Sequence, residues 1–270
     1  MDAWLILLPA FALSILMIGT HTYLGLHVLA RGIIFVDLAL AQVAALGISF
    51  AFLLGQEVHG VMAQLYAFIA TLIAAAGFAK LRQLPDKTAR EVTIGCVYVV
   101  ATALSIVVLS RSSQGMEELK GLLNGHILWV QWSEIAFVAV IYGLLTLFHW
   151  CFRQRFYRLS FHESGAAAVG YLWEFLFFAS FAVMITLAVN LAGVLLVFAF
   201  LIIPAFSASL LSQSFRNQLL IGWLLGGCVS AVGLWLSFVA DLPTGATVVA
   251  VMGCMPIIAL VVKSTFKRAG

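Results

Sequence analysis

The stretch Arg31–Gly47, RGIIFVDLALAQVAALG, places a carboxylate and an amide inside an apolar segment. These two polar residues are Asp37 and Gln42. A carboxylate in hydrocarbon is costly unless it is paired or lines a wet path. Asp37 is therefore a candidate ligand for a divalent metal ion, because carboxylate oxygens bind such ions. The alternative is that Asp37 pairs with a neighbour or lies near a membrane face, where water solvates it.

Two of the six histidines, His21 and His27, lie on the preceding apolar segment. If the two segments form a helical hairpin that turns near Arg31, positions equidistant from the turn share a depth. His21 and Gln42 then lie about ten residues, or roughly 15 Å, from the turn. His27 and Asp37 lie about five residues, or roughly 8 Å, from it. Imidazole and carboxylate suit Zn²⁺, Mn²⁺ or Fe²⁺, so the pattern predicts a weak cation site. The alternative is a hydrogen-bonded pair that only fixes helix packing.

The composition predicts an all-α, polytopic membrane protein with one transmembrane domain over residues 1–270. Hydrophobic residues make up 64% of the chain, charged residues only 9%, and the mean hydropathy is +1.12. The long apolar runs exclude an outer-membrane barrel, whose strands alternate. About nine runs are long enough to cross a bilayer. They lie near residues 3–28, 33–55, 60–80, 92–110, 131–151, 167–189, 191–211, 218–240 and 245–262. The sixth and seventh could be one broken helix, because the turn at Asn190 is short.

The positive charges predict the orientation of these spans. Cations concentrate in one set of alternate loops, and only two lie in the other set, which indicates that the first set faces the cytoplasm. The N-terminus is then outside and the C-terminus is cytoplasmic. The cytoplasmic set is Arg31, Lys80, Arg82, Lys87, Arg90, Arg153, Arg155, Arg158, Arg216, Lys263, Lys267 and Arg268, and the outer set is Arg111 and Lys120.

Several kinds of chemistry are missing from the sequence. It has no phosphate-binding loop of the Gly-x-x-x-x-Gly-Lys-Ser/Thr type, no His-Glu-x-x-His and no Gly-x-Ser-x-Gly motif. The four cysteines are scattered and resemble buried hydrophobic residues more than a metal framework. The cations are spread over several loops, which argues against nucleic-acid binding. We therefore expect a transport protein that is not an enzyme and has no resident cofactor.

Two motifs resemble the membrane subunit of ABC importers for divalent metals, the family that handles zinc, manganese and iron. Residues 193–208, GVLLVFAFLIIPAFSA, are close to the family's G-V-L-L-V-x-A-L-L-V-I-P-A-A-x-A. Pro204 lies inside this motif and predicts a kinked helix, because proline cannot donate a backbone hydrogen bond. Residues 241–245, DLPTG, match a second family motif at the outer end of a span. The resemblance places Asp241 at the outer mouth of the translocation pathway.

Two further segments extend this resemblance with differences. The family pattern R-R-x-x-x-x-G-D-x-L-S-H aligns its aspartate with Asp37, but its histidine falls on Ala41, one place before Gln42. Residues 161–170, FHESGAAAVG, resemble the cytoplasmic segment that contacts the ATPase, with His162 in place of the usual aspartate. We expect its small residues, four apart, to form a flat helix face for docking. The proposed coupling residues are Phe161, His162, Ala166 and Gly170.

The resemblance implies an ABC-importer permease fold and an ATP-driven importer of zinc, manganese or iron. It also implies three partners besides membrane lipid: a second copy of the chain, a cytoplasmic ATPase and an external solute-binding protein. Two alternatives remain at this point. One is a secondary cation transporter or channel that works alone, and the other is a structural or assembly protein of the membrane. The identity of the metal, or of a metal chelate, is open.

Overall fold

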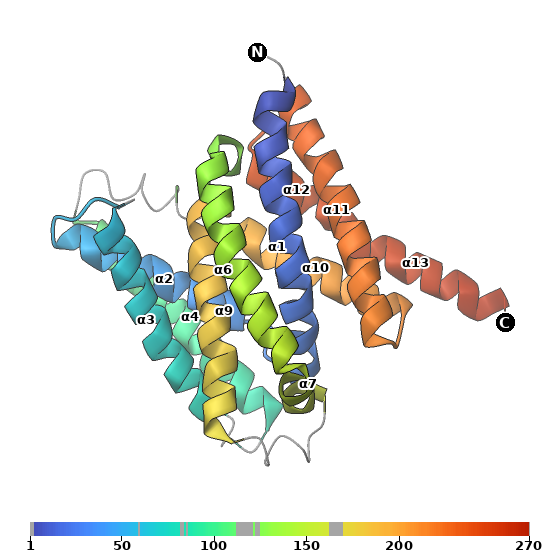
Figure 1. The fold of residues 1–270 in the computed structure, drawn as a ribbon, viewed down its shortest axis with the longest axis horizontal. Helices are drawn as coiled ribbons and strands as arrows, with labels where there is room; N and C mark the ends of the chain where they lie inside the picture. The colour runs from blue at the N-terminus through green and yellow to red at the C-terminus, as the bar shows by residue number, and fades with distance from the viewer. Residues whose placement is uncertain are drawn as a thin grey trace. The chain divides into compact units, whose positions relative to one another are not determined.

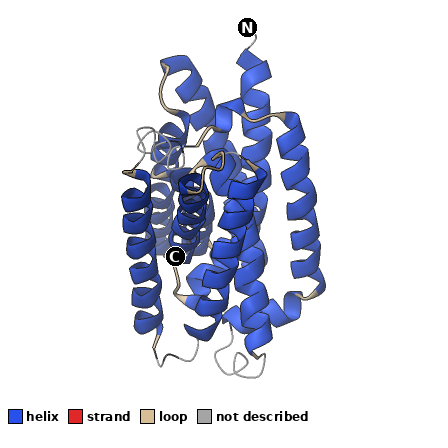
Figure 2. Ribbon diagram, turned by 90° about the vertical axis from the view of Figure 1, so that its left-hand side faces the viewer, coloured by secondary structure: helices blue, strands red, loops and turns tan. Residues whose placement is uncertain are grey.

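The computed structural model describes residues 3–58, 60–81, 84, 86–111, 121, 125–161 and 170–269. In this part of the chain every regular element is a helix (Figure 2). Nine helices there are long and apolar enough to cross a membrane, which confirms the all-α, polytopic prediction. The last of the nine, Thr244–Thr265, is interrupted at Gly253. The sixth and seventh spans are separate helices, because Gly193 between them adopts a φ of 80°.

The helices follow one another along the chain in the order coloured in Figure 1. They are α1 (Ala3–Arg31), α2 (Val36–Leu53), α3 (Val61–Lys80), α4 (Lys87–Leu109), the 3₁₀ helix η2 (Ile127–Trp129), α6 (Trp132–Cys151), α7 (Arg153–Phe161), α9 (Tyr171–Ala192), α10 (Val194–Leu211), α11 (Phe215–Ala240), α12 (Thr244–Met252) and α13 (Cys254–Ala269).

The chain divides into two compact units. Unit 1 comprises Met1–Leu29, Asn124–Gly143 and Leu191–Gly270, and unit 2 comprises Ala30–Leu123 and Leu144–Asn190. Each unit draws on segments that are far apart in the sequence, so neither is a simple half of the chain. His21 and His27 belong to unit 1, whereas Asp37 and Gln42 belong to unit 2. The predicted single domain over the whole chain stays a prediction.

Close contacts between small residues and α10 hold unit 1 together. Gly25 on α1 packs on the backbone of Leu201, where an added Cβ would lie 2.0 Å from the carbonyl oxygen. Gly222 and Gly226 on α11 both face Pro204, which lies inside α10. These glycines let the helices approach closely beside the proline. The spacing of small residues four apart on α11 is therefore used in packing.

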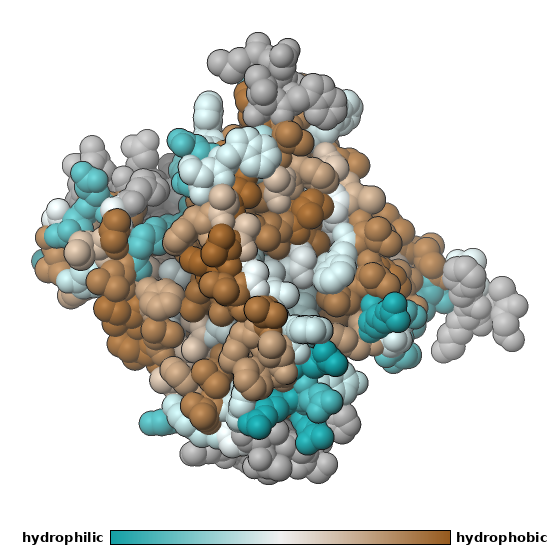
Figure 3. All heavy atoms as spheres, in the orientation of Figure 1, coloured by the Kyte–Doolittle hydropathy of each residue, from teal (hydrophilic) through white to brown (hydrophobic). Residues whose placement is uncertain are grey.

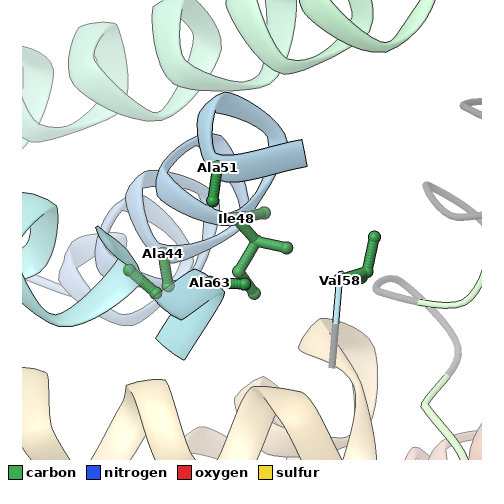
Figure 4. Close-up of a cluster of buried hydrophobic side chains, with 7 residues drawn as sticks. Ala44, Ile48, Ala51, Val58 and Ala63 are labelled. Atoms are coloured by element: carbon green, nitrogen blue, oxygen red, sulfur yellow. The ribbon is translucent and has the colours of Figure 1, made fainter. Parts of the chain in front are cut away.

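Unit 2 is built around α2, which packs against both α3 and α4. At Gly47 an added Cβ would lie 2.7 Å from the Cα of Ala67, so only glycine permits this approach of α2 to α3. Small and branched side chains fill the space beyond that contact (Figure 4). The buried cluster is Ala44, Ala45, Ile48, Ala51, Val58, Ala63 and Ala67.

The exposed surface of the spans is apolar, as hydrocarbon requires. Large hydrophobic side chains stand out from α3 and α11, for example Ile73 at 69% and Leu224 at 68% exposure. Apolar side chains cover much of the visible face in Figure 3. By contrast, α2 is largely enclosed by protein. The polar residues of α2 therefore face protein and not lipid.

Candidate metal-transport site

Asp37 lies in the first turn of α2 and is only 1% exposed. Within the described part of the chain, neither of its carboxylate oxygens has a hydrogen-bond partner. Phe35, at the N-cap position of α2, makes no side-chain hydrogen bond to the helix. The free backbone N–H groups of a helix start favour a negative charge in the first turn. Asp37 is thus a buried acceptor that no donor among the described residues satisfies.

A second carboxylate, Glu91 on α4, also approaches the start of α2. The backbone N–H of Phe35 donates to Glu91 Oε1 at 2.9 Å. The other oxygen, Oε2, is buried and has no hydrogen-bond partner among the described residues. Glu91 was not predicted as a site residue, because it lies outside the first two spans and outside the segments that resemble family motifs. Its position in a predicted cytoplasmic connection, next to Arg90, was the available signal.

Gln42 follows Asp37 by five positions on α2 and is 2% exposed. Five residues correspond to a turn of about 140° around the helix, so the two side chains point to different sides. The Oε1 atom of Gln42 is buried without a hydrogen-bond partner in the described structure. Asp37 and Gln42 are therefore both buried in protein, and each has an acceptor without a partner among the described residues.

The two histidines of α1 are buried in different ways. His21 is fully buried, and its Nδ1 lies 2.9 Å from the carbonyl oxygen of Met17. Its Nε2 has no partner among the residues that the structure describes. His27 is 1% exposed and packs edge-on against Tyr23 and Phe215, with ring centroids 4.6 and 5.7 Å away. His21 therefore has a ring nitrogen available to a ligand, while His27 lies among aromatic rings.

Within the described residues no three His, Cys, Asp or Glu side chains gather closely enough to hold a metal ion together. A preformed cage would bind its ion too firmly for a transporter, which must also release it. The histidines of α1 were expected to match the polar residues of α2 in depth, and these residues belong to different units. The match stays a prediction.

Arg31 at the end of α1 pairs with Glu174 in the first turn of α9. Their side chains are 9% and 2% exposed. The Arg31 guanidinium also lies over the rings of Phe177 and Phe178, 4.5 and 5.0 Å from their centroids. Because this pair is enclosed, removing one partner would leave a buried charge. Glu174 was also not predicted as a functional residue, since its partner is far away in the chain.

The segment predicted to couple to the ATPase, residues 161–170, is described only at its ends. His162 and Ala166 lie outside the described residues. Phe161 ends α7, and its ring stacks on Tyr157 with centroids 4.7 Å apart. Gly170 lies outside any helix with a φ of 80°, which is left-handed backbone. The predicted flat helix face therefore does not extend to Gly170, because right-handed helical backbone requires a negative φ.

Asp241 forms the C-cap of α11 and is exposed. Its φ of 53° and ψ of 46° are left-handed, a conformation that Asp and Asn tolerate better than most side chains. Ser237 donates to the carbonyl of Leu242 at 2.7 Å and lies 2.8 Å from Thr244 Oγ1, which closes the turn. The exposed position agrees with a solvated turn, whereas the predicted role at the pathway entrance stays untested.

Residues 4–263 match the ABC 3 transport family. The chain belongs to this family. It is 26% identical over 248 residues to a probable iron transport system membrane protein of Haemophilus influenzae, covering 90% of this chain and 85% of that protein. It is 25% identical over 235 residues to the manganese transport system membrane protein MntC of Listeria monocytogenes, covering 84% and 80%.

Solved structures of ABC transporters share the fold of this member of the ABC 3 family. The structure of PsaBC from Streptococcus pneumoniae, in complex with Fab, superposes with a TM-score of 0.76 at 22% identity, covering 94% of this chain and 90% of that one. An inward-facing metal-chelate type ABC transporter superposes with a TM-score of 0.66 at 20% identity, covering 94% and 86%. The ABC-importer permease fold expected from the resemblance is confirmed.

Proposed function

We propose that this chain is the membrane-spanning permease of an ATP-driven importer that moves a divalent metal ion, zinc, manganese or iron, into the cytoplasm. The family and the names of its relatives support metal transport. Asp37 is the observation that carries the proposal within this chain. A buried carboxylate with two unpartnered oxygens is expensive unless a cation or water reaches it.

We also assign Gln42, His21, His27 and Asp241 to the pathway. Gln42 and His21 each present a buried acceptor without a partner in the described structure. His27 is proposed from its position on α1, and Asp241 from its exposed turn at the end of α11. Asp241 would attract the incoming cation or the protein that delivers it. Asp37 is the residue proposed to contact the metal.

We assign the same three partners as the family resemblance implies. A cytoplasmic ATPase would supply the energy, and an external solute-binding protein would deliver the metal to a homodimer of this chain. The exposed cations of α7, Arg153, Arg155 and Arg158, support a cytoplasmic docking surface beside Phe161. From the charge distribution we propose that the N-terminus lies outside and the C-terminus lies in the cytoplasm, in a bacterial plasma membrane. The permease itself would have no enzymatic activity and no resident cofactor, since the metal is its cargo.

Replacement of Asp37 by alanine tests the proposal. In cells that produce the complete importer, Asp37→Ala should abolish metal uptake while the amount of permease in the membrane stays normal. Asp37→Asn keeps the shape but removes the charge and should lose most of the uptake. Glu134→Gln is the matched control, because that carboxylate is exposed and accepts from the nearby Gln131 backbone. Normal uptake by Asp37→Ala would remove Asp37 from the pathway.

The secondary transporter remains the competing function, and the energy source separates the two. Vesicles that contain the permease without its ATPase should not accumulate metal when an ion gradient is applied. Accumulation driven by that gradient alone would favour the secondary transporter. Uptake that requires both the ATPase and ATP would exclude it.

A further inference from the structure

The backbone hydrogen bond of His21 determines which ring nitrogen is available. Nδ1 lies 2.9 Å from the Met17 carbonyl oxygen, and a carbonyl can only accept. Nδ1 therefore carries the hydrogen, and in the neutral ring the lone pair resides on Nε2. The hydroxyl of Thr20 adds a second contact to Nδ1 at 3.2 Å while donating to the Met17 carbonyl at 3.1 Å.

This arrangement is the one that a metal-binding histidine needs. A histidine ligand normally donates its other ring N–H to a carbonyl or carboxylate, which fixes the tautomer and the ring orientation. At His21 the Nε2 atom is fully buried and has no partner among the described residues. Tyr142 on α6 holds the ring from one side, with centroids 5.9 Å apart. An oriented lone pair in a buried position is thus left without a donor.

His149, in unit 2, shows that burial alone does not produce an unused nitrogen. Its Nε2 lies 2.8 Å from Ser180 Oγ, and that hydroxyl donates to the carbonyl of Phe177 at 2.9 Å. The Ser180 oxygen therefore accepts, and His149 Nε2 donates to it. The ring also stacks on Phe156, with centroids 4.1 Å apart and an interplanar angle of 13°. His149 is consequently a matched control for His21.

We infer that His21 Nε2 is a transient ligand for the transported ion and that it selects ions with affinity for nitrogen. This inference rests on the proposed transport function and specifies its substrate class. Imidazole suits Zn²⁺ and Fe²⁺, whereas Mn²⁺, Mg²⁺ and Ca²⁺ prefer oxygen ligands. A single nitrogen ligand binds a metal ion weakly, as a transport pathway requires. This permease should therefore carry Zn²⁺ or Fe²⁺ in preference to Mn²⁺.

The first experiment detects the ligand directly. Purified full-length permease in lipid nanodiscs is mixed with Zn²⁺ alone, and zinc-edge X-ray absorption reports scattering from a coordinated imidazole. The wild-type protein should show that signal. His21→Gln should lose it and bind Zn²⁺ about tenfold more weakly, whereas His149→Gln should keep it. A signal that survives in His21→Gln, or an absent signal in zinc-bound wild-type protein, would overturn the inference.

The second experiment uses the complete importer with its ATPase and solute-binding protein. Uptake of Zn²⁺ and Mn²⁺ is measured separately, and the ratio of the two rates is compared between variants. His21→Gln should lower the zinc-to-manganese ratio by about tenfold, while His149→Gln should leave it unchanged. A purely structural role for His21 would lower both rates together and leave the ratio constant, which contradicts the inference. Failure of the wild-type importer to move any divalent metal would instead contradict the proposed function.

Discussion

Buried polar groups in this permease fall into two kinds, and the Arg31–Glu174 pair and Asp37 illustrate the difference. Arg31 and Glu174 neutralise each other in the interior of unit 2. Asp37 lies in the same unit, is equally buried, and has no hydrogen-bond partner within the described structure. A charge paired with its opposite can be explained by packing and specificity alone. An unsatisfied carboxylate needs another explanation, and transport of a cation provides one.

Glu174→Ala should have the largest effect on stability, because it leaves the Arg31 guanidinium buried without its carboxylate. Breaking a buried pair from one side typically costs about 3–5 kcal/mol. We expect a marked loss of permease from the membrane and a lower thermal unfolding midpoint in detergent. Uptake per remaining molecule should change far less than in Asp37→Ala.

The double variant Arg31→Met, Glu174→Leu provides the control for that measurement. Apolar replacements of similar volume remove both charges, and such exchanges are often neutral or stabilising. Methionine can also retain contact with Phe177 and Phe178, over which Arg31 lies. Recovery of the membrane level would confirm a structural pair. If Glu174→Ala instead folded normally but lost uptake, Glu174 would join Asp37 as a transport residue.

Replacement of Gln42 should reduce metal uptake less than replacement of Asp37. Gln42 is buried and its Oε1 is unpartnered, but an amide carries no charge to attract a cation. Gln42→Ala should reduce metal uptake severalfold without loss of protein, measured beside Asp37→Ala in the same cells. Gln42→His should shift the zinc-to-manganese uptake ratio if this position replaces the family histidine. An unchanged ratio in a correctly inserted Gln42→His variant would mean that Gln42 does not replace the family histidine. That histidine would then simply be absent from this chain, with Ala41 at its aligned position.

The membrane fold could be predicted from the sequence because apolar length determines it directly. Asp37 and Gln42 were also visible, since an ionisable or amide group inside an apolar run is unusual. The partners of buried groups could not be predicted in the same way. Glu174 meets Arg31 only through folding, and a sequence separation of 143 residues gives no local signal for that contact.

Backbone conformation and ring contacts were also beyond prediction from pattern alone. Gly170 was expected on a helix because of its spacing from Ala166, but its left-handed φ excludes it. His27 was predicted as a pathway residue from its depth alone, and that spacing gave no signal for the packing of Tyr23 and Phe215 against its ring. Hydrophobic periodicity reports which residues are buried and not which neighbours they meet.

The smallest effect is expected at Asp241, which is exposed and therefore contrasts with the buried Asp37. Water solvates a carboxylate in such a turn, so it can attract a cation but cannot bind it tightly. Asp241→Asn should lower uptake by less than about threefold, with a larger deficit at low ionic strength, where charges are less screened. Asparagine also tolerates the left-handed backbone, so the turn should persist. The measurement is initial uptake rate at two salt concentrations, with surface protein quantified in parallel. Complete loss of uptake at normal protein levels would place Asp241 in the central mechanism beside Asp37.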